Sequence, residues 1–277
     1  MANSKAIYQA ACNSISLSEP AEEIAAIAML LVAQLTGLNA TQVLAGKEVL
    51  LEASDLQPLL ERINKHEPIQ YVLGESVFMG RMFIVTPAVL IPRPETEELV
   101  GHALRSVRNR PHASVLDLGT GSGCIAISIG CESPARVTGV DISGAALEIA
   151  RRNAVLNGAR VDWIQQDMTA PWPEGNWDLV VSNPPYIGRQ ESAAMSANVL
   201  GYEPDLALFA PGNDPLFFYR AIATQGGERL AAGAEVWTEL NPLYAESAAV
   251  LFTAEGFHQV NLYKDLFERY RFLHAVR

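Results

Sequence analysis

The segment that decides the fold is Val115-Leu116-Asp117-Leu118-Gly119-Thr120-Gly121-Ser122-Gly123, in which a short apolar run passes into three glycines. It predicts a strand at 114–118 and a helix that begins at Cys124. Glycines let the backbone turn sharply and approach a ligand closely, and the start of a helix offers free N–H groups. In open parallel sheets a ligand lies beyond the carboxyl ends of the strands. We therefore expect a binding site in this loop.

The alternation of short apolar strands with helices continues to the end of the chain. We expect a helix at 145–156 and further strands at 136–140, 161–165, 177–182, 234–240, 257–263 and 270–275. Such alternation predicts an α/β, Rossmann-like domain whose mainly parallel sheet is covered by helices on both faces.

The first part of the chain has helical periodicity instead. Pro20 followed by two glutamates suits the start of a helix, whose apolar body runs to Leu35 with Gly37 as the expected cap. A second apolar set repeats at helical spacing: Leu56, Leu59, Leu60 and Ile63. These features predict a small all-α helical bundle over residues 1–74, and we expect substrate recognition as its role.

Between these two regions the pattern changes twice. Apolar residues from 76 to 91 surround Gly80, which predicts a β-hairpin with its turn at this glycine. The two prolines of Ile91-Pro92-Arg93-Pro94-Glu95-Thr96-Glu97-Glu98 predict a stiff, extended segment, followed by a helix over 97–108. The predicted domains are therefore 1–74, a hairpin and linker at 75–96, and the α/β domain at 97–277.

Composition and charge disfavour several classes of function. The chain has 277 residues, of which 49% are hydrophobic and 18% charged, as in soluble globular proteins with a sizeable core. The apolar run at 24–33 is too short to cross a bilayer of ~30 Å, and the first residues do not resemble a signal peptide. Three cysteines without metal or disulfide spacing and five scattered histidines predict a cytoplasmic protein with no metal site. A net charge of −11 without a Lys/Arg-rich run disfavours a long nucleic-acid substrate.

The spacing of the three glycines indicates which cofactor to expect. A dinucleotide-binding loop has its third glycine one residue later, whereas this spacing resembles methyltransferase loops that hold the amino-acid end of S-adenosylmethionine. We assign these residues to that cofactor: Gly119, Thr120, Gly121, Ser122, Gly123, Asp141, Asp167 and Met168. Asp141 would accept the ribose hydroxyl protons and Asp167 the adenine amino group, while Met168 would cover the ring. The alternatives are a dinucleotide site, or residues that serve packing and an ordinary loop.

The most specific feature is Asn183-Pro184-Pro185-Tyr186, directly after the apolar strand at 177–182. An amide or aromatic-amine nitrogen is a poor nucleophile because its lone pair is delocalised, so an enzyme must orient it and stabilise the charge that develops on it. The side-chain carbonyl of Asn183 and the backbone carbonyl of Pro184 would hold the two N–H bonds of an NH₂ group. Tyr186 would stack on the flat acceptor, and the prolines would restrict the backbone in advance. The alternative is a strand that ends in an ordinary proline turn.

Four segments carry a resemblance to a known family: Glu67-Pro68-Ile69-Gln70-Tyr71-Val72-Leu73-Gly74, Ile91-Pro92-Arg93-Pro94-Glu95-Thr96-Glu97, Asp117-Leu118-Gly119-Thr120-Gly121-Ser122-Gly123 and Ser182-Asn183-Pro184-Pro185-Tyr186-Ile187. The second segment is the narrowest, because amino-methylating enzymes in general share the Asn-Pro-Pro-Tyr loop. Over nearly its whole length the chain resembles the release-factor glutamine methyltransferase family.

The resemblance implies a small helical domain joined by a hairpin to a methyltransferase domain of seven strands. It implies S-adenosyl-L-methionine as cofactor and S-adenosyl-L-homocysteine as product. The implied substrate is the glutamine in the Gly-Gly-Gln motif of bacterial peptide-chain release factors. The resemblance also implies catalytic roles for Asn183, Pro184 and Tyr186, glutamine binding by these residues together with Pro185, and a place for Asn183 in the cofactor site. Phe83 matches a family aromatic that flanks the substrate.

Two other functions stay open from the residues alone. An adenine-N6 methyltransferase acting on DNA or RNA would use the same acceptor geometry, although the acidic charge disfavours it. A non-catalytic translation-factor binding module would keep the fold, although the intact loops disfavour it. The chain departs from the family pattern at Met168, where many relatives have an aromatic residue, and at Asn241, where relatives often have glycine in a Glu-Ile-Gly sequence. We expect neither a membrane nor a direct nucleic-acid partner.

Overall fold

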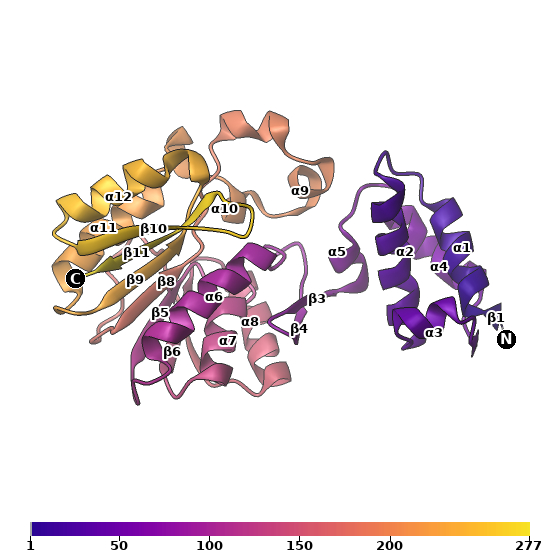
Figure 1. The fold of residues 1–277 in the computed structure, drawn as a ribbon, viewed down its shortest axis with the longest axis horizontal. Helices are drawn as coiled ribbons and strands as arrows, with labels where there is room; N and C mark the ends of the chain where they lie inside the picture. The colour runs from indigo at the N-terminus through magenta and orange to yellow at the C-terminus, as the bar shows by residue number, and fades with distance from the viewer. Residues whose placement is uncertain (1) are drawn as a thin grey trace. The chain divides into compact units, whose positions relative to one another are not determined.

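The computed structural model describes residues 2–277, apart from the side chains of Ala53 and Ala194. The chain forms two compact units (Figure 1). The first contains the residues up to Gly74 together with Ser196–Tyr202, and the second contains Glu75–Met195 and Glu203–Arg277. The sequence predicts one continuous domain over 97–277, whereas Ser196–Tyr202 belongs to the first unit. There the Tyr202 hydroxyl donates to the Lys65 carbonyl (2.8 Å).

The first unit consists of short helices around one apolar core. Its elements are β1 (Ala2–Asn3), α1 (Ser4–Ser14), α2 (Ala21–Thr36), α3 (Ala40–Leu44), β2 (Glu48–Val49), α4 (Ala53–Ile63), α5 (Ile69–Leu73) and α9 (Ala197–Tyr202). Helix α2 ends at Gly37, whose φ of +68° suits glycine. Leu31, Leu56 and Ile63 are almost fully buried in the core. The apolar repeats of the sequence thus predict this core correctly, but not the two-residue pairing of β1 with β2.

A β-hairpin opens the second unit, as predicted. Strand β3 (Glu75–Phe78) pairs antiparallel with β4 (Arg81–Ile84), and the turn residues Met79 and Gly80 both have the positive φ that two-residue hairpins favour. The helix predicted to begin at Glu97 begins three residues earlier, because Pro94 is the first residue of α6 (Pro94–Val107), so the extended segment ends before Pro94. The fixed φ and missing N–H of a proline suit the first position of a helix.

The seven-stranded sheet of the second unit confirms the predicted fold class. Its strands are β5 (Ser114–Leu118), β6 (Arg136–Asp141), β7 (Val161–Gln165), β8 (Leu179–Ser182), β9 (Glu235–Glu239), β10 (His258–Lys264) and β11 (Tyr270–Val276). They lie in the order β10-β11-β9-β8-β5-β6-β7, and all neighbours are parallel except β11, which is antiparallel to β9 and β10. The chain moves from β5 to β6 and β7 on one side and then crosses to β8 on the other. Ligands of open sheets bind at such a reversal, beyond the carboxyl ends of the strands.

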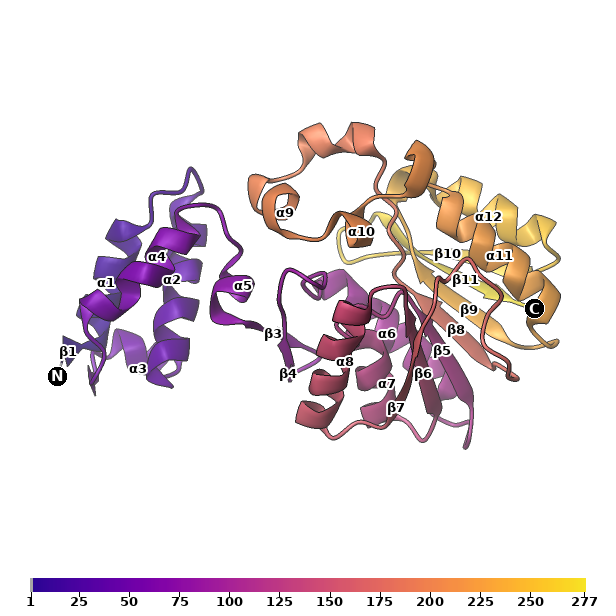
Figure 2. The same ribbon diagram turned by 180° about the vertical axis from the view of Figure 1, so that it is seen from behind.

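Helices cover both faces of this sheet (Figures 1 and 2). Helices α6, α7 (Cys124–Glu132) and α8 (Gly144–Asn157) lie on one face, and α11 (Phe217–Arg229) and α12 (Ala245–Ala254) lie on the other. The connections contain η1 (Arg189–Ala194), α10 (Asp205–Leu208), η2 (Pro211–Asn213) and η3 (Pro242–Tyr244). Within β5, Val115 packs in the core beside α6 and α7, whereas Leu116 and Leu118 join the core beside α11 and α12. No helix within residues 2–277 is both long and apolar enough to span a membrane.

Candidate active site

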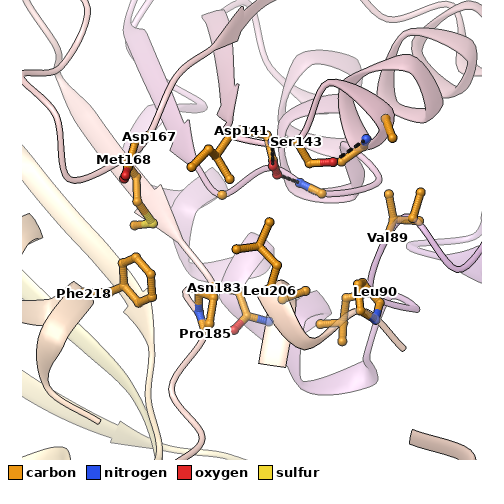
Figure 3. Close-up of a pocket in the computed structure, with 18 of the residues that line it drawn as sticks. Val89, Leu90, Asp141, Ser143, Asp167, Met168, Asn183, Pro185, Leu206 and Phe218 are labelled. Atoms are coloured by element: carbon orange, nitrogen blue, oxygen red, sulfur yellow. Dashed lines mark hydrogen bonds between the residues drawn. The ribbon is translucent and has the colours of Figure 1, made fainter. Parts of the chain in front are cut away.

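A cavity of about 390 Å³ lies at the carboxyl ends of the parallel strands of the second unit (Figure 3). Its wall contains seven residues that the sequence assigns to the site: Gly119, Gly121, Asp141, Asp167, Met168, Asn183 and Pro185. They belong to the carboxyl ends of β5, β6, β7 and β8 and the loops that follow them. Asp141 and Asn183 lie on opposite sides of the cavity in Figure 3. The structure therefore brings the glycine loop and the Asn-Pro-Pro-Tyr loop to one site.

The glycine loop, residues 119–123, is held by backbone hydrogen bonds. The N–H groups of Gly119 and Thr120 both donate to the Val140 carbonyl (2.9 Å each), and the Gly123 N–H donates to the Thr120 carbonyl (2.8 Å). A Cβ on Gly123 would lie 2.9 Å from the Trp163 ring, so glycine is needed where the loop enters α7. The loop thus follows one defined path along the cavity wall.

Three residues of this loop support it from behind and do not line the cavity. The buried Thr120 hydroxyl donates to Asp117 Oδ2 (2.6 Å). Ser122 is also buried, and its carbonyl accepts from Asn153 Nδ2 (2.9 Å). Gly123 packs against the core as described above. Direct cofactor contacts of Thr120, Ser122 and Gly123 stay predictions.

Asp117 is a fully buried carboxyl group at the end of β5. Its Oδ2 accepts from the Thr120 hydroxyl and from the Ala126 N–H (3.2 Å), whereas no donor among the described residues reaches its Oδ1. Burial raises the pKa of Asp117 to about 7. Near neutral pH this group is therefore only partly ionised.

Asp141 connects the glycine loop with the second parallel strand. Its Oδ2 accepts from the Gly121 N–H (2.8 Å) and its Oδ1 from the Ser143 N–H (2.9 Å). Burial raises the pKa of Asp141, while these two N–H groups oppose the rise. Each carboxylate oxygen keeps a second acceptor position. Asp141 can therefore accept two hydroxyl groups of a ligand while the backbone fixes its orientation.

Asp167 and Met168 form the adjoining part of the wall. Asp167 Oδ1 accepts from the N–H and the hydroxyl of Thr169 (2.8 Å each), which leaves the other oxygen for a ligand. Met168 is held by a bond from Gln225 Nε2 to its carbonyl (3.1 Å), and its Sδ lies 3.8 Å from where a Cβ on Gly119 would be. The thioether therefore offers an apolar surface beside the glycine loop.

Side chains from other elements hold the catalytic loop, residues 183–186. Asn183 Nδ2 donates to Thr96 Oγ1 (3.1 Å), which leaves Asn183 Oδ1 as the acceptor available to a ligand. The Thr96 hydroxyl donates to Glu239 Oε2 (2.8 Å), and the Tyr186 hydroxyl donates to Glu239 Oε1 (2.9 Å). Two residues of this loop are therefore tied to one buried carboxylate of β9.

The two prolines and the tyrosine of the loop differ in exposure. Pro185 lines the cavity, whereas Pro184 is buried and neither Pro184 nor Tyr186 belongs to the cavity wall. Burial raises the pKa of Tyr186, so its hydroxyl stays protonated and can donate to Glu239. Contacts of Pro184 and Tyr186 with an acceptor stay predictions.

Thr96 and Glu239, which the sequence motifs do not assign to the site, are hydrogen-bonded to the Asn-Pro-Pro-Tyr loop. Both are buried, with 2% and 1% of their surface exposed. Their signals in the sequence are indirect: Thr96 lies in the narrowest family segment, and Glu239 is a carboxylate near the end of the strand expected at 234–240. They meet across 143 positions of the chain, which no local pattern can reveal.

Asn241, a departure from the family pattern, also holds the catalytic loop. Its Nδ2 donates to Glu191 Oε2 (3.0 Å) and to the Tyr186 carbonyl (3.4 Å), and its Oδ1 accepts from the Leu243 N–H (3.1 Å). A glycine at this position would lack all these bonds. The departure therefore adds a link between the end of β9 and the segment after Tyr186.

The structure places Phe83 in the core and not at the cavity. Its side chain is 0% exposed and packs edge-on against Phe78, with ring centroids 5.9 Å apart. Its neighbour in β4, Ile84, exchanges hydrogen bonds with the Asn153 side chain of α8 (2.7 and 3.0 Å). Phe83 therefore does not line the cavity, and its contact with the substrate stays a prediction.

A buried carboxylate supports another part of the cavity wall, which contains Arg93 and Pro204. Glu203 Oε1 accepts from an Arg93 amino group (2.5 Å) and its Oε2 accepts from the Ile91 N–H (3.2 Å). Apolar side chains that line the cavity are Val89, Leu90, Leu206, Phe217 and Phe218. The cavity wall thus combines these apolar side chains with polar groups, among them Asp141, Asp167 and Asn183.

Comparison with known proteins identifies the family. A profile described as a methyltransferase small domain matches residues 100–201, and one described as the PrmC N-terminal domain matches residues 13–74. A release factor glutamine methyltransferase of Bordetella pertussis is 44% identical over 72% of this chain and 74% of the relative. The release factor glutamine methyltransferase of Bacteroides thetaiotaomicron is 43% identical over 265 residues, covering 93% of this chain and 94% of the relative. The chain belongs to the release factor glutamine methyltransferase family.

As a member of this family, the chain is an S-adenosylmethionine-dependent methyltransferase. A solved methyltransferase from Pyrococcus furiosus has the same fold, with a TM-score of 0.54 at 19% identity over 80% of this chain and 98% of that chain. The predicted family is thus confirmed. All predicted cofactor residues, from Gly119 to Asn183, lie within the stretch that the methyltransferase profile matches.

Proposed function

We propose that this methyltransferase modifies the side-chain amide nitrogen of the glutamine in the Gly-Gly-Gln motif of bacterial peptide-chain release factors. The observation that carries the proposal is the orientation of Asn183. Its Nδ2 is occupied by Thr96, so its Oδ1 can accept from a planar NH₂ group at the cavity. The relatives are named release factor glutamine methyltransferases, and these names favour this acceptor. A substrate of this kind would place the enzyme in the cytoplasm.

The residues of the cavity fit the cofactor. S-adenosyl-L-methionine, when bound, supplies an electrophilic methyl group on a sulfonium and leaves as S-adenosyl-L-homocysteine. The wall at Gly119 and Gly121 has no side chains and would admit the amino-acid end. Asp141 has the free acceptor positions that two ribose hydroxyls need. Asp167 has a free carboxylate oxygen for an adenine amino group, and Met168 offers an apolar surface for the ring.

The catalytic loop would activate the glutamine by orientation. An amide nitrogen can attack only when its lone pair is turned away from conjugation with its carbonyl. Asn183 Oδ1 and the Pro184 carbonyl would accept its two N–H bonds and stabilise the positive charge that develops on the nitrogen. The nitrogen becomes acidic once it is methylated, so its proton can leave to water without a strong base. Tyr186 would limit the position of the flat amide, with its own hydroxyl held by Glu239.

Mass spectrometry tests the proposal directly. Purified enzyme is incubated with cofactor and a bacterial release factor, and the peptide with the Gly-Gly-Gln motif is examined for one added methyl group on the glutamine. A release factor with this glutamine replaced by alanine is the matched control. DNA and ribosomal RNA are assayed in parallel with labelled cofactor.

Methylation of the wild-type motif alone supports the proposal. Label that enters nucleic acid and not release factor would refute it in favour of an adenine-N6 methyltransferase. Tight binding of release factor and cofactor without turnover would favour a binding module instead.

A further inference from the structure

We infer that Glu239, acting through Thr96, is the positioning residue that determines which way the Asn183 amide faces. The inference deepens the proposed function, on which it rests for the identity of the acceptor. The orientation of the amide can be measured in the free enzyme, so the two ideas can fail separately.

A chain of hydrogen bonds connects Glu239 with Asn183. Glu239 Oε2 accepts from the Thr96 hydroxyl (2.8 Å), and Thr96 Oγ1 accepts from Asn183 Nδ2 (3.1 Å). Glu239 and Thr96 are buried at 1% and 2% exposure, so the bond between them is shielded from water. The three residues come from β9, α6 and the loop after β8.

The direction of the protons in this chain follows from chemistry. An ionised carboxylate only accepts hydrogen bonds, and a threonine hydroxyl has one proton. Because that proton is given to Glu239, Thr96 can only accept from its other neighbour. Asn183 must therefore turn its NH₂ group toward Thr96. The flipped amide would place two acceptor oxygens about 3 Å apart without a proton between them, which costs free energy. Asn183 Oδ1 is thereby left for the acceptor amide.

The same carboxylate also holds the aromatic residue of the loop. Glu239 Oε1 accepts from the Tyr186 hydroxyl (2.9 Å). Burial raises the pKa of Glu239, while the hydrogen bonds from Thr96 and Tyr186 and the charge of Arg271 oppose this rise. The Nη1 of Arg271 donates to the Leu240 carbonyl (3.4 Å). One carboxylate outside the Asn-Pro-Pro-Tyr loop thus orients two of its side chains.

Turnover of paired variants separates positioning from a general structural role. Thr96→Val removes the hydroxyl, so Asn183 loses its orienting partner, and kcat should fall on the order of 10²-fold. The binding constant for S-adenosylhomocysteine should change little. Thr96→Ser keeps the hydroxyl and should restore most of the turnover. In an Asn183→Ala background, Thr96→Val should have almost no further effect, because both changes remove the same interaction. A full, additive loss in that background would overturn the inference.

A substitution at Glu239 tests the direction of the hydrogen bonds from Asn183 through Thr96 to Glu239. Glu239→Gln introduces an NH₂ donor that can reverse the Thr96 hydroxyl and turn its proton toward Asn183. The variant is measured in a Tyr186→Phe background, which removes the other hydrogen bond to Glu239. A further fall in kcat, again without a matching loss of cofactor affinity, is expected there. Unchanged kcat in this background would contradict the role assigned to the carboxylate.

Nuclear magnetic resonance gives a measurement that needs no substrate. The side-chain NH₂ signals of Asn183 are identified by their absence in Asn183→Ala. Their exchange with solvent should be slow in the wild type and in Thr96→Ser, and fast in Thr96→Val. Fast exchange in the wild type would overturn the inference even if Thr96→Val does not fold. Slow exchange together with an unmethylated release factor would refute the proposed substrate and leave the positioning role supported.

Discussion

The glycine loop and the Asn-Pro-Pro-Tyr loop meet at one cavity, but they are held in place in different ways. The glycine loop uses its own backbone, whose N–H groups donate to Val140 and Asp141 of the neighbouring strand. The Asn-Pro-Pro-Tyr loop depends on single side chains, because Asn183 is held by Thr96. Tyr186 is likewise held by Glu239. The comparison teaches that the glycine-loop end of the cavity is built by backbone bonds to the adjacent strand, whereas the Asn-Pro-Pro-Tyr end, where we propose that the acceptor binds, depends on side chains far apart in the chain.

The largest effect on turnover should come from Asn183→Ala, which tests whether acceptor binding can be impaired without impairing cofactor binding. Loss of one transition-state acceptor should lower turnover on the order of 10²–10³-fold. The affinity for S-adenosylhomocysteine should fall much less, because the backbone cradle and Asp141 are untouched. Methyl-transfer assays and calorimetry measure the two quantities. An equal loss in both would show that the ends are not independent.

The next effect concerns stability and comes from Asp117 at the cofactor end. Burial raises its pKa from 3.8 to about 7, so between these values the folded chain binds a proton that the unfolded chain has lost. Stability should therefore fall as pH rises from about 4 to about 7, by at most about 1.4 kcal/mol per pH unit from this group. Asp117→Asn keeps an acceptor for Thr120 and removes this slope. Urea unfolding of the apo forms should give a difference between variant and wild type that grows with pH, and a constant difference would contradict the assignment.

Asp141→Ala tests the glycine-loop end of the cavity, where cofactor affinity should fall more than turnover. It removes the acceptor for two hydroxyls and leaves the N–H groups of Gly121 and Ser143 without their partner. Charge-assisted bonds of this kind contribute about 1.5–3 kcal/mol, so binding of S-adenosylhomocysteine should weaken about 10- to 100-fold. Turnover at saturating cofactor should change less. Asp162→Ala, at an exposed position of β7, is the matched control and should bind normally.

The smallest effect is expected from Asn241→Gly, which removes the side chain just after the end of β9. It removes the side-chain bonds to Glu191, Tyr186 and the Leu243 backbone, at a cost of about 1 kcal/mol in the free energy of unfolding. Turnover should stay close to that of the wild type, because Thr96 and Glu239 still hold the loop. Asn241→Asp, which puts a second carboxylate beside Glu191, should destabilise more than glycine does. The reverse order would mean that Asn241 does not act through Glu191.

The same contrast explains how much the sequence could predict. The strand at 114–118, the glycine loop and the aspartate after the second strand follow from local periodicity and from where parallel strands end. These features are confirmed in the fold, and Asp141 lies where the strand order places it. The Asn-Pro-Pro-Tyr loop is recognised by its place directly after the apolar strand at 177–182, and its Asn183 and Pro185 do line the cavity.

What the sequence could not predict depends on distant partners. The contacts of Thr96 and Glu239 require α6 and β9 to lie beside the catalytic loop, which only the assembled sheet determines. Phe83 was assigned by likeness to an aromatic position, but burial depends on packing that a motif does not contain. The start of α6 was predicted too late because Pro94 was taken as part of an extended segment. A proline breaks the interior of a helix, but it suits the first turn, where Pro94 lies.

The membership of Ser196–Tyr202 in the first unit makes that unit discontinuous. The backbone passes between the units after Gly74, after Met195 and after Tyr202, so they share three covalent crossings. A cut after Gly74 would leave one helix of the first unit on the larger fragment. A single fusion junction is consequently not enough to transfer the complete first unit from one enzyme to another. A transferable version would need the 196–202 helix carried over with it, and a recombination map of the family should show these two segments inherited together.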